Sequence, residues 1–187
     1  MEFLRNELKS IVNTLNKEDL DKRFQEIAET LMTNYAIENS KGGIYFLNEI
    51  EFYYYDSLYD DKRSGNGKTR ITYERTAPAG SWFIHDCGVD LTFDSDKDKG
   101  YGGGILIRAI ENSTTQKSIV GPVNCLNELW DEAVDAFSQT APNPRIVKIE
   151  KRNIELNDPD TRVKVEKVDP YQSKWRFTVR GKDVSKK

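Results

Sequence analysis

The chain has 187 residues, enough for one domain with a sizeable core, and its 37% hydrophobic and 32% charged residues are ordinary for a soluble globular protein. No apolar run approaches the ~20 residues that span a bilayer, and the first residues lack the basic and apolar regions of a signal peptide, so we expect a cytoplasmic monomer that does not enter a membrane. The net charge of −3 argues weakly against a protein that holds duplex DNA through its phosphates.

The first elements in chain order are two helices. Apolar residues recur at helical spacing over 2–15 and again over 17–35, where Asn16 and Asp19 form a start signal. Residues 40–43 then predict a hairpin turn into a strand over 44–55. Residues 56–80 are polar and predict a long surface loop.

Short elements follow the loop. Strands are predicted at 82–85, 89–93 and 105–111, a helix at 125–137, and further strands at 145–149, 162–168 and 175–180. Gly102, Gly103 and Gly104 precede a strand and not a helix, so we expect them to allow a bulge or a close approach of backbones. Strands with peripheral helices and no βαβ rhythm predict a single α+β domain over 1–187.

The strand over 44–55 carries two carboxylates among tyrosines. Strict alternation places Glu49, Glu51 and Tyr53 on one face. It also places Ile44, Phe46, Ile50, Phe52 and Tyr54 on the other, mostly apolar face, together with Asn48. A carboxylate on an aromatic-lined face is a candidate general base, with flat surfaces nearby for a flat ligand. The alternative is a solvated strand edge with cross-strand Glu–Lys pairs.

Arg108 lies inside an otherwise apolar strand. Because burying an unpaired charge is unfavourable, we expect a buried carboxylate beside it, either Glu51 or Asp90. Such a pair is purely structural, or it lines a tyrosine pocket and holds a water. Cys87 and Cys125 lie far apart and His85 is the only histidine, so no zinc spacing is present and we expect no metal.

Several short motifs, in the same order along the chain, resemble the alkyladenine (3-methyladenine) DNA glycosylase family. Residues 49–53 look like the family's Glu-x-Glu-Ala-Tyr strand, whose second Glu is the general base. The other similar segments are residues 78–85, 106–111, 121–122 and 174–181. The resemblance covers about residue 17 to the end. It implies a curved, mostly antiparallel sheet with peripheral helices, with residues 1–16 as an N-terminal helical extension.

The resemblance implies base excision, in which a modified purine of DNA is flipped into an aromatic pocket. Glu51 would activate the water that attacks the sugar C1′, and Arg108 would help to hold that water. Neither a cofactor nor a metal is implied. The base-binding positions are Tyr53, His85, Phe83 and Asp94, and the DNA-binding positions are Lys62, Arg63, Arg176 and Arg180.

Two departures from the family pattern leave other functions open. The family's histidine after the Glu strand is missing from residues 59–64, and the hairpin tip reads Asp86-Cys87-Gly88, where the family inserts a large side chain into DNA. The alternatives are a non-catalytic module that binds a nucleobase-like molecule or a protein segment, and an N-glycosidase on a small nucleoside-like substrate. The charge around Glu51 discriminates between a nucleic-acid substrate and the alternatives. Nucleic acid would be favoured by a ring of cations there, from Lys62, Arg63, Lys68, Arg70, Arg176 and Arg180. It would be disfavoured by a majority of carboxylates, from Asp86, Asp90, Asp94 and Asp96.

Overall fold

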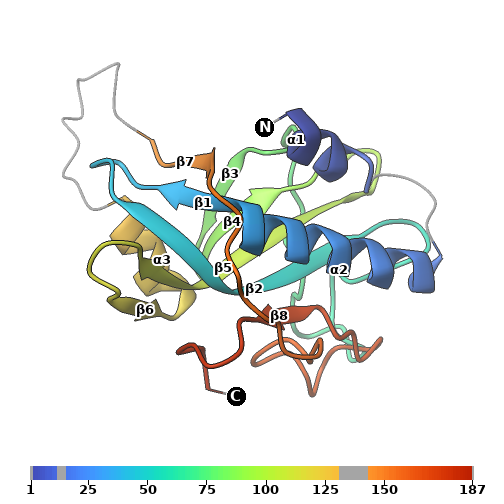
Figure 1. The fold of residues 1–187 in the computed structure, drawn as a ribbon. Coiled ribbons are helices and arrows are strands. Elements are labelled where there is room, and N and C mark those ends of the chain that lie inside the picture. The colour runs from blue at the N-terminus through green and yellow to red at the C-terminus, as the bar shows by residue number, and fades with distance from the viewer. Residues whose placement is uncertain (1, 12–15, 131–142, 187) are drawn as a thin grey trace.

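A curled antiparallel sheet of eight strands organises the fold (Figure 1). The computed structural model describes residues 2–11, 16–130 and 143–186. Six strands follow one another in the order β3-β4-β5-β2-β1-β7, while β6 pairs with β5 and β8 pairs with β2. The strands are β1 (Tyr35–Glu38), β2 (Ile44–Tyr55), β3 (Trp82–His85), β4 (Gly88–Thr92), β5 (Gly102–Asn112), β6 (Ser118–Val120), β7 (Arg145–Lys148) and β8 (Arg176–Thr178). The prediction of a single α+β domain is confirmed.

Three helices flank this sheet in the described part of the chain. They are α1 (Glu2–Lys9), α2 (Lys17–Asn34) and α3 (Pro122–Leu129). The predicted start of α2 is confirmed, because the Asn16 side chain accepts a hydrogen bond from the Asp19 backbone N–H at 3.0 Å. The end of the predicted first helix (12–15) and of the predicted third helix (131–137) lies outside the described residues. No described helix combines the length and the apolar character that crossing a membrane requires.

The predicted strand at 162–168 is wrong. Residues 163–168 form turns, and Lys164 has a left-handed backbone with φ of +67°. The alternation of Val163 and Val165 with charged residues is typical of a strand, but Arg162 is held in a buried cluster of ion pairs at the start of the segment. This tertiary contact fixes the backbone away from the sheet.

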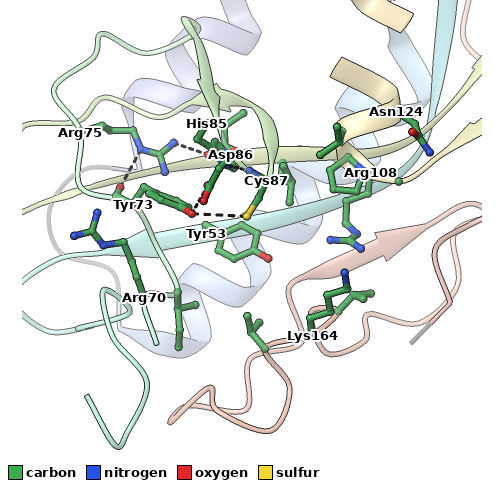
Figure 2. Close-up of a pocket in the computed structure, with 18 residues that line it drawn as sticks. Tyr53, Arg70, Tyr73, Arg75, His85, Asp86, Cys87, Arg108, Asn124 and Lys164 are labelled. Atoms are coloured by element: carbon green, nitrogen blue, oxygen red, sulfur yellow. Dashed lines mark hydrogen bonds and ion pairs between the residues drawn. The ribbon is translucent and has the colours of Figure 1, made fainter. Parts of the chain in front are cut away.

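Residues 56–80 contain no helix or strand, as predicted, but they do not lie only on the surface. Asp61, Thr72 and Arg75 are buried, and Ile71 packs inward with them. Figure 2 shows Tyr73 and Arg75 pointing toward the hairpin that carries His85. The segment therefore contributes to the domain interior through these residues, and Asp61, Thr72 and Arg75 are paired there, while other polar residues such as Arg63 and Arg70 stay exposed.

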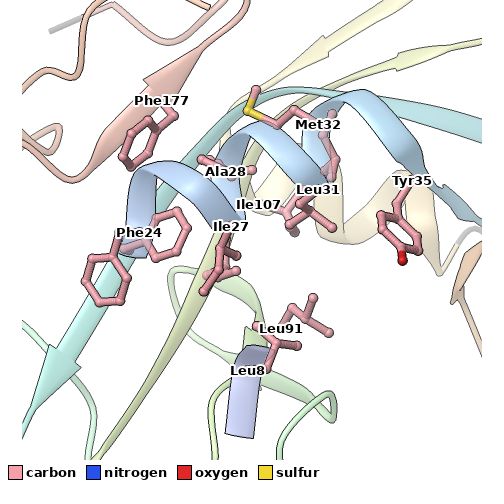
Figure 3. Close-up of a cluster of buried hydrophobic side chains, with 14 of the residues drawn as sticks. Leu8, Phe24, Ile27, Ala28, Leu31, Met32, Tyr35, Leu91, Ile107 and Phe177 are labelled. Carbon is pink, nitrogen blue, oxygen red and sulfur yellow. The ribbon is translucent and has the colours of Figure 1, made fainter. Parts of the chain in front are cut away.

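The core lies between α2 and the sheet (Figure 3). Phe24 on α2 lies at its centre, with ring centroids 4.5 Å from Phe52 and 5.6 Å from Phe93, and with Trp175 edge-on at 5.0 Å. These aromatic contacts bury large apolar areas and add specific geometry. They hold β2, which carries the candidate site, firmly against α2.

Gly103 provides a test of the close approach predicted for the glycine run. A Cβ built at this position would lie 2.0 Å from the carbonyl oxygen of Tyr53 on the paired strand β2. We expect Gly103→Ala to lower the free energy of unfolding by about 3 kcal/mol or more, because the methyl group must force the strands apart. Urea denaturation measures this loss. Gly65→Ala is the matched control, because its Cβ would lie 3.7 Å from Pro170 in ordinary contact, and its stability should stay within about 1 kcal/mol.

Candidate functional site

A double irregularity in the β2–β5 ladder builds the site. The register runs from Leu47 opposite Ile110 to Glu49 opposite Ala109 and then to Ile50 opposite Ile107. It therefore leaves out Asn48 on β2 and Arg108 on β5. Such bulges redirect side chains and are common beside functional sites. Here the bulge lets Arg108 reach two carboxylates of the neighbouring strand.

Because of the bulge, the predicted faces of β2 are wrong for the residues that precede it. Tyr45 and Leu47 belong to the core together with Ile50, Phe52 and Tyr54, whereas Phe46 lies outside the core and stacks with Arg152 at 4.4 Å. Uninterrupted alternation had grouped Phe46 with Ile50. One extra residue at the bulge exchanges the two faces for the part of β2 before it.

Glu49 and Glu51 lie in the sheet interior, so the alternative of a solvated strand edge is wrong. Both side chains are 0% exposed. Arg108 donates from Nε to Glu49 and from Nη1 to Glu51, each at 3.2 Å, and is itself only 6% exposed. The predicted carboxylate partner of Arg108 is thus Glu51, joined by Glu49 and not by Asp90.

Glu49 has a structural role. It accepts hydrogen bonds from Arg176 Nε at 2.7 Å and from the Ser185 backbone N–H at 2.6 Å, in addition to Arg108. Arg176, a predicted DNA contact, is therefore buried in this network and offers almost no surface to a ligand. Arg180, the other predicted contact near the C-terminal end, is exposed, pairs with Glu155 at 2.7 Å and lies outside the pocket described below.

Glu51 is held by three donors. Its carboxylate accepts from the Tyr53 hydroxyl at 2.8 Å and the Val163 backbone N–H at 2.6 Å, besides Arg108. Burial raises the pKa of Glu51 above the ordinary carboxyl value, although Arg108, Val163 and Tyr53 all favour its charged form. A buried carboxyl group with a raised pKa is suited to general acid–base chemistry.

A pocket of about 380 Å³ lies beside the groups that bond this carboxylate (Figure 2), although Glu51 itself is not one of the lining residues. Tyr53, Arg108 and Val163 line it, so the groups that bond Glu51 form the pocket wall. The volume is in the range of small-molecule and cofactor sites. Its other lining side chains include Arg70, Ile71, Tyr73, Arg75, His85, Asp86, Cys87, Asp90, Leu106, Pro122, Val123, Asn124, Lys164 and Val165.

The predicted base-binding residues divide into two groups. Tyr53 and His85 line the pocket, and the His85 ring lies 4.8 Å from the Tyr73 ring. Phe83 lies behind the wall, where the Arg75 guanidinium covers its ring at 4.3 Å, and Asp94 accepts a hydrogen bond from the Ala79 N–H away from the pocket.

Asp90 positions two pocket residues. It accepts from Arg75 Nη1 at 2.6 Å and lies 3.2 Å from His85 Nε2. Burial alone would raise the pKa of Asp90, but the hydrogen bond to His85 and the charge of Arg75 outweigh it and lower the pKa. Asp90 is thus a charged, paired group that fixes both neighbours.

The charge at the pocket mouth is mixed. Arg70 and Lys164 line the pocket, and no described carboxylate lies within ion-pair distance of either. Asp86 lines it too, with a side chain that is 76% exposed. Lys62 and Arg63 lie next to Arg70 in a shallow adjoining depression that also holds Asp60 and Glu74. Lys68, Asp94 and Asp96 do not line the pocket.

Arg162 supports the pocket from behind, and no sequence pattern predicted this role. Its guanidinium pairs with Asp61 at 2.6 Å and Asp169 at 2.7 Å, and none of these three side chains is more than 2% exposed. It also lies 4.8 Å from the Tyr53 ring and 5.1 Å from the Trp175 ring. Because Val163 and Lys164 follow it directly, Arg162 sets the position of both pocket residues.

No known protein family matches the chain, and a search of curated proteins finds no similar sequence.

Proposed function

We propose that the chain hydrolyses the N-glycosidic bond of a modified purine in DNA, in the manner of the alkyladenine DNA glycosylases. One observation carries this proposal: Glu51, a buried carboxylate with a raised pKa, stands behind a pocket of about 380 Å³ whose wall contains its partners Arg108 and Tyr53. The bulged antiparallel sheet and the order of the motifs agree with that family.

The pocket suits a flat heterocycle. Tyr53, Tyr73 and His85 present rings, and Leu106 and Val163 present apolar surface. Aromatic faces stack on any base with little dependence on its hydrogen-bonding edge. Arg108, Asn124 and Lys164 also line the pocket and supply polar groups for orientation. A purine that enters between these walls would bring its glycosidic bond toward Arg108.

The chemistry follows from the Glu51–Arg108 pair. Glu51 takes a proton from a water, the water oxygen forms a bond to the sugar C1′, and the C1′–N bond breaks with its electron pair passing to the departing base. Arg108 orients the water, and its charge favours the ionised form of Glu51 against the effect of burial. The exposed cations for phosphate are Arg70, Lys164 and Arg63, beside the half-buried Lys62, which pairs with Glu74 at 3.6 Å. We place Arg176 and Arg180 outside this surface.

Release of a free base tests the proposal. Duplex and single-stranded oligonucleotides containing hypoxanthine or 3-methyladenine are incubated with the protein, and liberated base is separated by chromatography. We expect release that weakens steeply with added salt, because phosphate contacts are lost. Release that is indifferent to salt and restricted to free nucleosides would instead support an N-glycosidase of small substrates.

The pH dependence of release gives a second prediction. Glu51 must be ionised to act as a base, so the rate should fall as the pH falls through its raised pKa, which lies above the ordinary carboxyl range. The folded-state pKa exceeds the unfolded value, so the stabilising contribution of protonated Glu51 is present at low pH and lost as the pH rises through the folded pKa. Activity should therefore decline on acidification before circular dichroism shows unfolding. A rate that is flat until the protein unfolds would contradict the role of Glu51.

A non-catalytic purine-binding module is the second candidate. It is favoured by the closed environment of Glu51, which has no exposed surface and three protein donors. Calorimetry with free purines separates the two candidates. Affinity that is unchanged in Glu51→Gln, with no base release from any substrate, would favour the binding module.

A further inference from the structure

The tip of the β3–β4 hairpin gathers three different metal-ligand types at the pocket mouth. His85, Asp86 and Cys87 are consecutive, and one ligand atom from each lies within 4.8 Å of the other two. All three side chains line the pocket (Figure 2). The arrangement differs from the paired cysteines and histidines of zinc fingers, because all its ligands come from a single turn.

His85 is oriented as metal-bound histidines usually are. Its Nε2 faces the Asp90 carboxylate at 3.2 Å, and Asp90 is anchored by Arg75 at 2.6 Å. A metal-bound imidazole usually donates its other ring N–H to a carboxylate. That carboxylate fixes the tautomer and leaves the lone pair of the remaining ring nitrogen for the metal. Here Nδ1 is left facing Asp86 and Cys87, and its present partner is the Cys87 backbone N–H at 3.2 Å.

The distances are close to those of a tetrahedral site. Metal bonds of about 2.0–2.3 Å to nitrogen, oxygen and sulfur place neighbouring ligand atoms roughly 3.3–3.7 Å apart. His85 Nδ1 lies 3.8 Å from Asp86 Oδ1, and the ligand atoms of His85, Asp86 and Cys87 all lie within 4.8 Å of one another. Asp86 and Cys87 are exposed at the turn, so their side chains can close the remaining gap by rotation.

We propose that His85, Asp86 and Cys87 bind a thiophilic divalent cation of the Zn²⁺ class, with Asp90 as the group that positions His85. Thiolate and imidazole ligands together select such metals over Mg²⁺ or Ca²⁺. The Tyr73 hydroxyl, which donates to Asp86 and lies 3.7 Å from Cys87 Sγ, borders the site. The site does not depend on the glycosidase proposal, since none of its ligands is assigned to bond cleavage.

Titration with Co²⁺ tests the site, because a cobalt–thiolate bond gives a charge-transfer absorption that oxygen and nitrogen ligands do not. The chain offers a built-in control: Cys125 is buried and its burial raises the pKa of its thiol to about 12, so a thiolate band reports on Cys87. We expect a stoichiometric band that Zn²⁺ abolishes, that is absent from Cys87→Ser, and that needs at least tenfold more Co²⁺ in His85→Gln and in Asp90→Asn.

Three results would overturn the proposal. They are the absence of a band in the wild-type protein, a band that persists in Cys87→Ser, and a titration of His85→Gln identical to that of the wild type, which would mean that the thiol binds alone. Cys87 is exposed at a turn, so Cys87→Ser should keep the wild-type melting temperature and remain interpretable. Asp86→Asn, at the most exposed ligand, provides a second variant that should fold normally and weaken the band.

Discussion

Replacement of Glu51 by glutamine should lower the rate of base release about 10²–10⁴-fold, the range that general acid–base catalysis contributes. Glutamine has nearly the same shape and still accepts the Val163 N–H, but it cannot take a proton from water. The measurement is single-turnover release of hypoxanthine from a labelled oligonucleotide. Urea denaturation of the same variant shows that the loss of activity is not a loss of folded protein.

Glu49→Gln is the matched control for this experiment. Glu49 lies on the same strand, is equally buried and bonds the same Arg108, but its other donors, Arg176 and Ser185, lie outside the pocket, whereas those of Glu51 line it. We expect this variant to lose stability, because Arg176 loses the closer of its two charged partners, and to retain activity within about tenfold of the wild type. Equal rates for Glu51→Gln and the wild-type protein would remove Glu51 from the mechanism.

Replacement of Arg162 by methionine should lower the free energy of unfolding by about 3–5 kcal/mol, the loss expected when one partner of a buried ion pair is removed. Asp61 and Asp169 would then face each other as buried carboxylates without a cation between them. Urea denaturation measures the effect. Because Arg162 also stacks against Tyr53, we expect purine binding to weaken in the folded fraction.

Arg180→Met is the control for Arg162→Met. Arg180 pairs with Glu155 at 2.7 Å, yet both side chains are largely exposed, so solvent screening leaves about 0–1 kcal/mol for the pair. A loss for Arg162→Met no larger than that of Arg180→Met would show that the buried cluster does not stabilise the fold.

A buried carboxylate beside Arg108 could be predicted from the sequence, because a charge in an apolar strand needs one, although the prediction left Glu51 and Asp90 open and did not include Glu49. Only a buried carboxylate compensates such a charge, and Glu51 lies on a strand of similar pattern. Helix α2 and the hairpin turn after it could also be predicted from the sequence, because both depend on local periodicity and turn residues. In each case the deciding interaction lies within the element or follows from a simple rule of burial.

The bulge and the Arg162 cluster could not be predicted in this way. Nothing in residues 44–55 shows that Asn48 leaves the register, yet that one residue exchanges the faces of β2. Arg162 and Asp61 are 101 residues apart, and an Asp in a polar loop is typical of a solvated turn. Their pairing depends on the packing of two irregular segments. Lys164 was missed for the same reason, because its place at the pocket follows from that of Arg162.

The hydrogen bond from Ser185 to Glu49 links the last residues of the chain to the pocket. Arg176 also donates to the Ser185 carbonyl. Ser185 is therefore hydrogen-bonded to Glu49, the same residue whose carboxylate accepts from Arg108. An affinity tag fused after residue 187, or a truncation before residue 185, would disturb the partner of Arg108 from a distance. Purification handles on this protein are therefore best attached at the N-terminal end, and a comparison of the two placements would show how strongly the tail and the pocket are coupled.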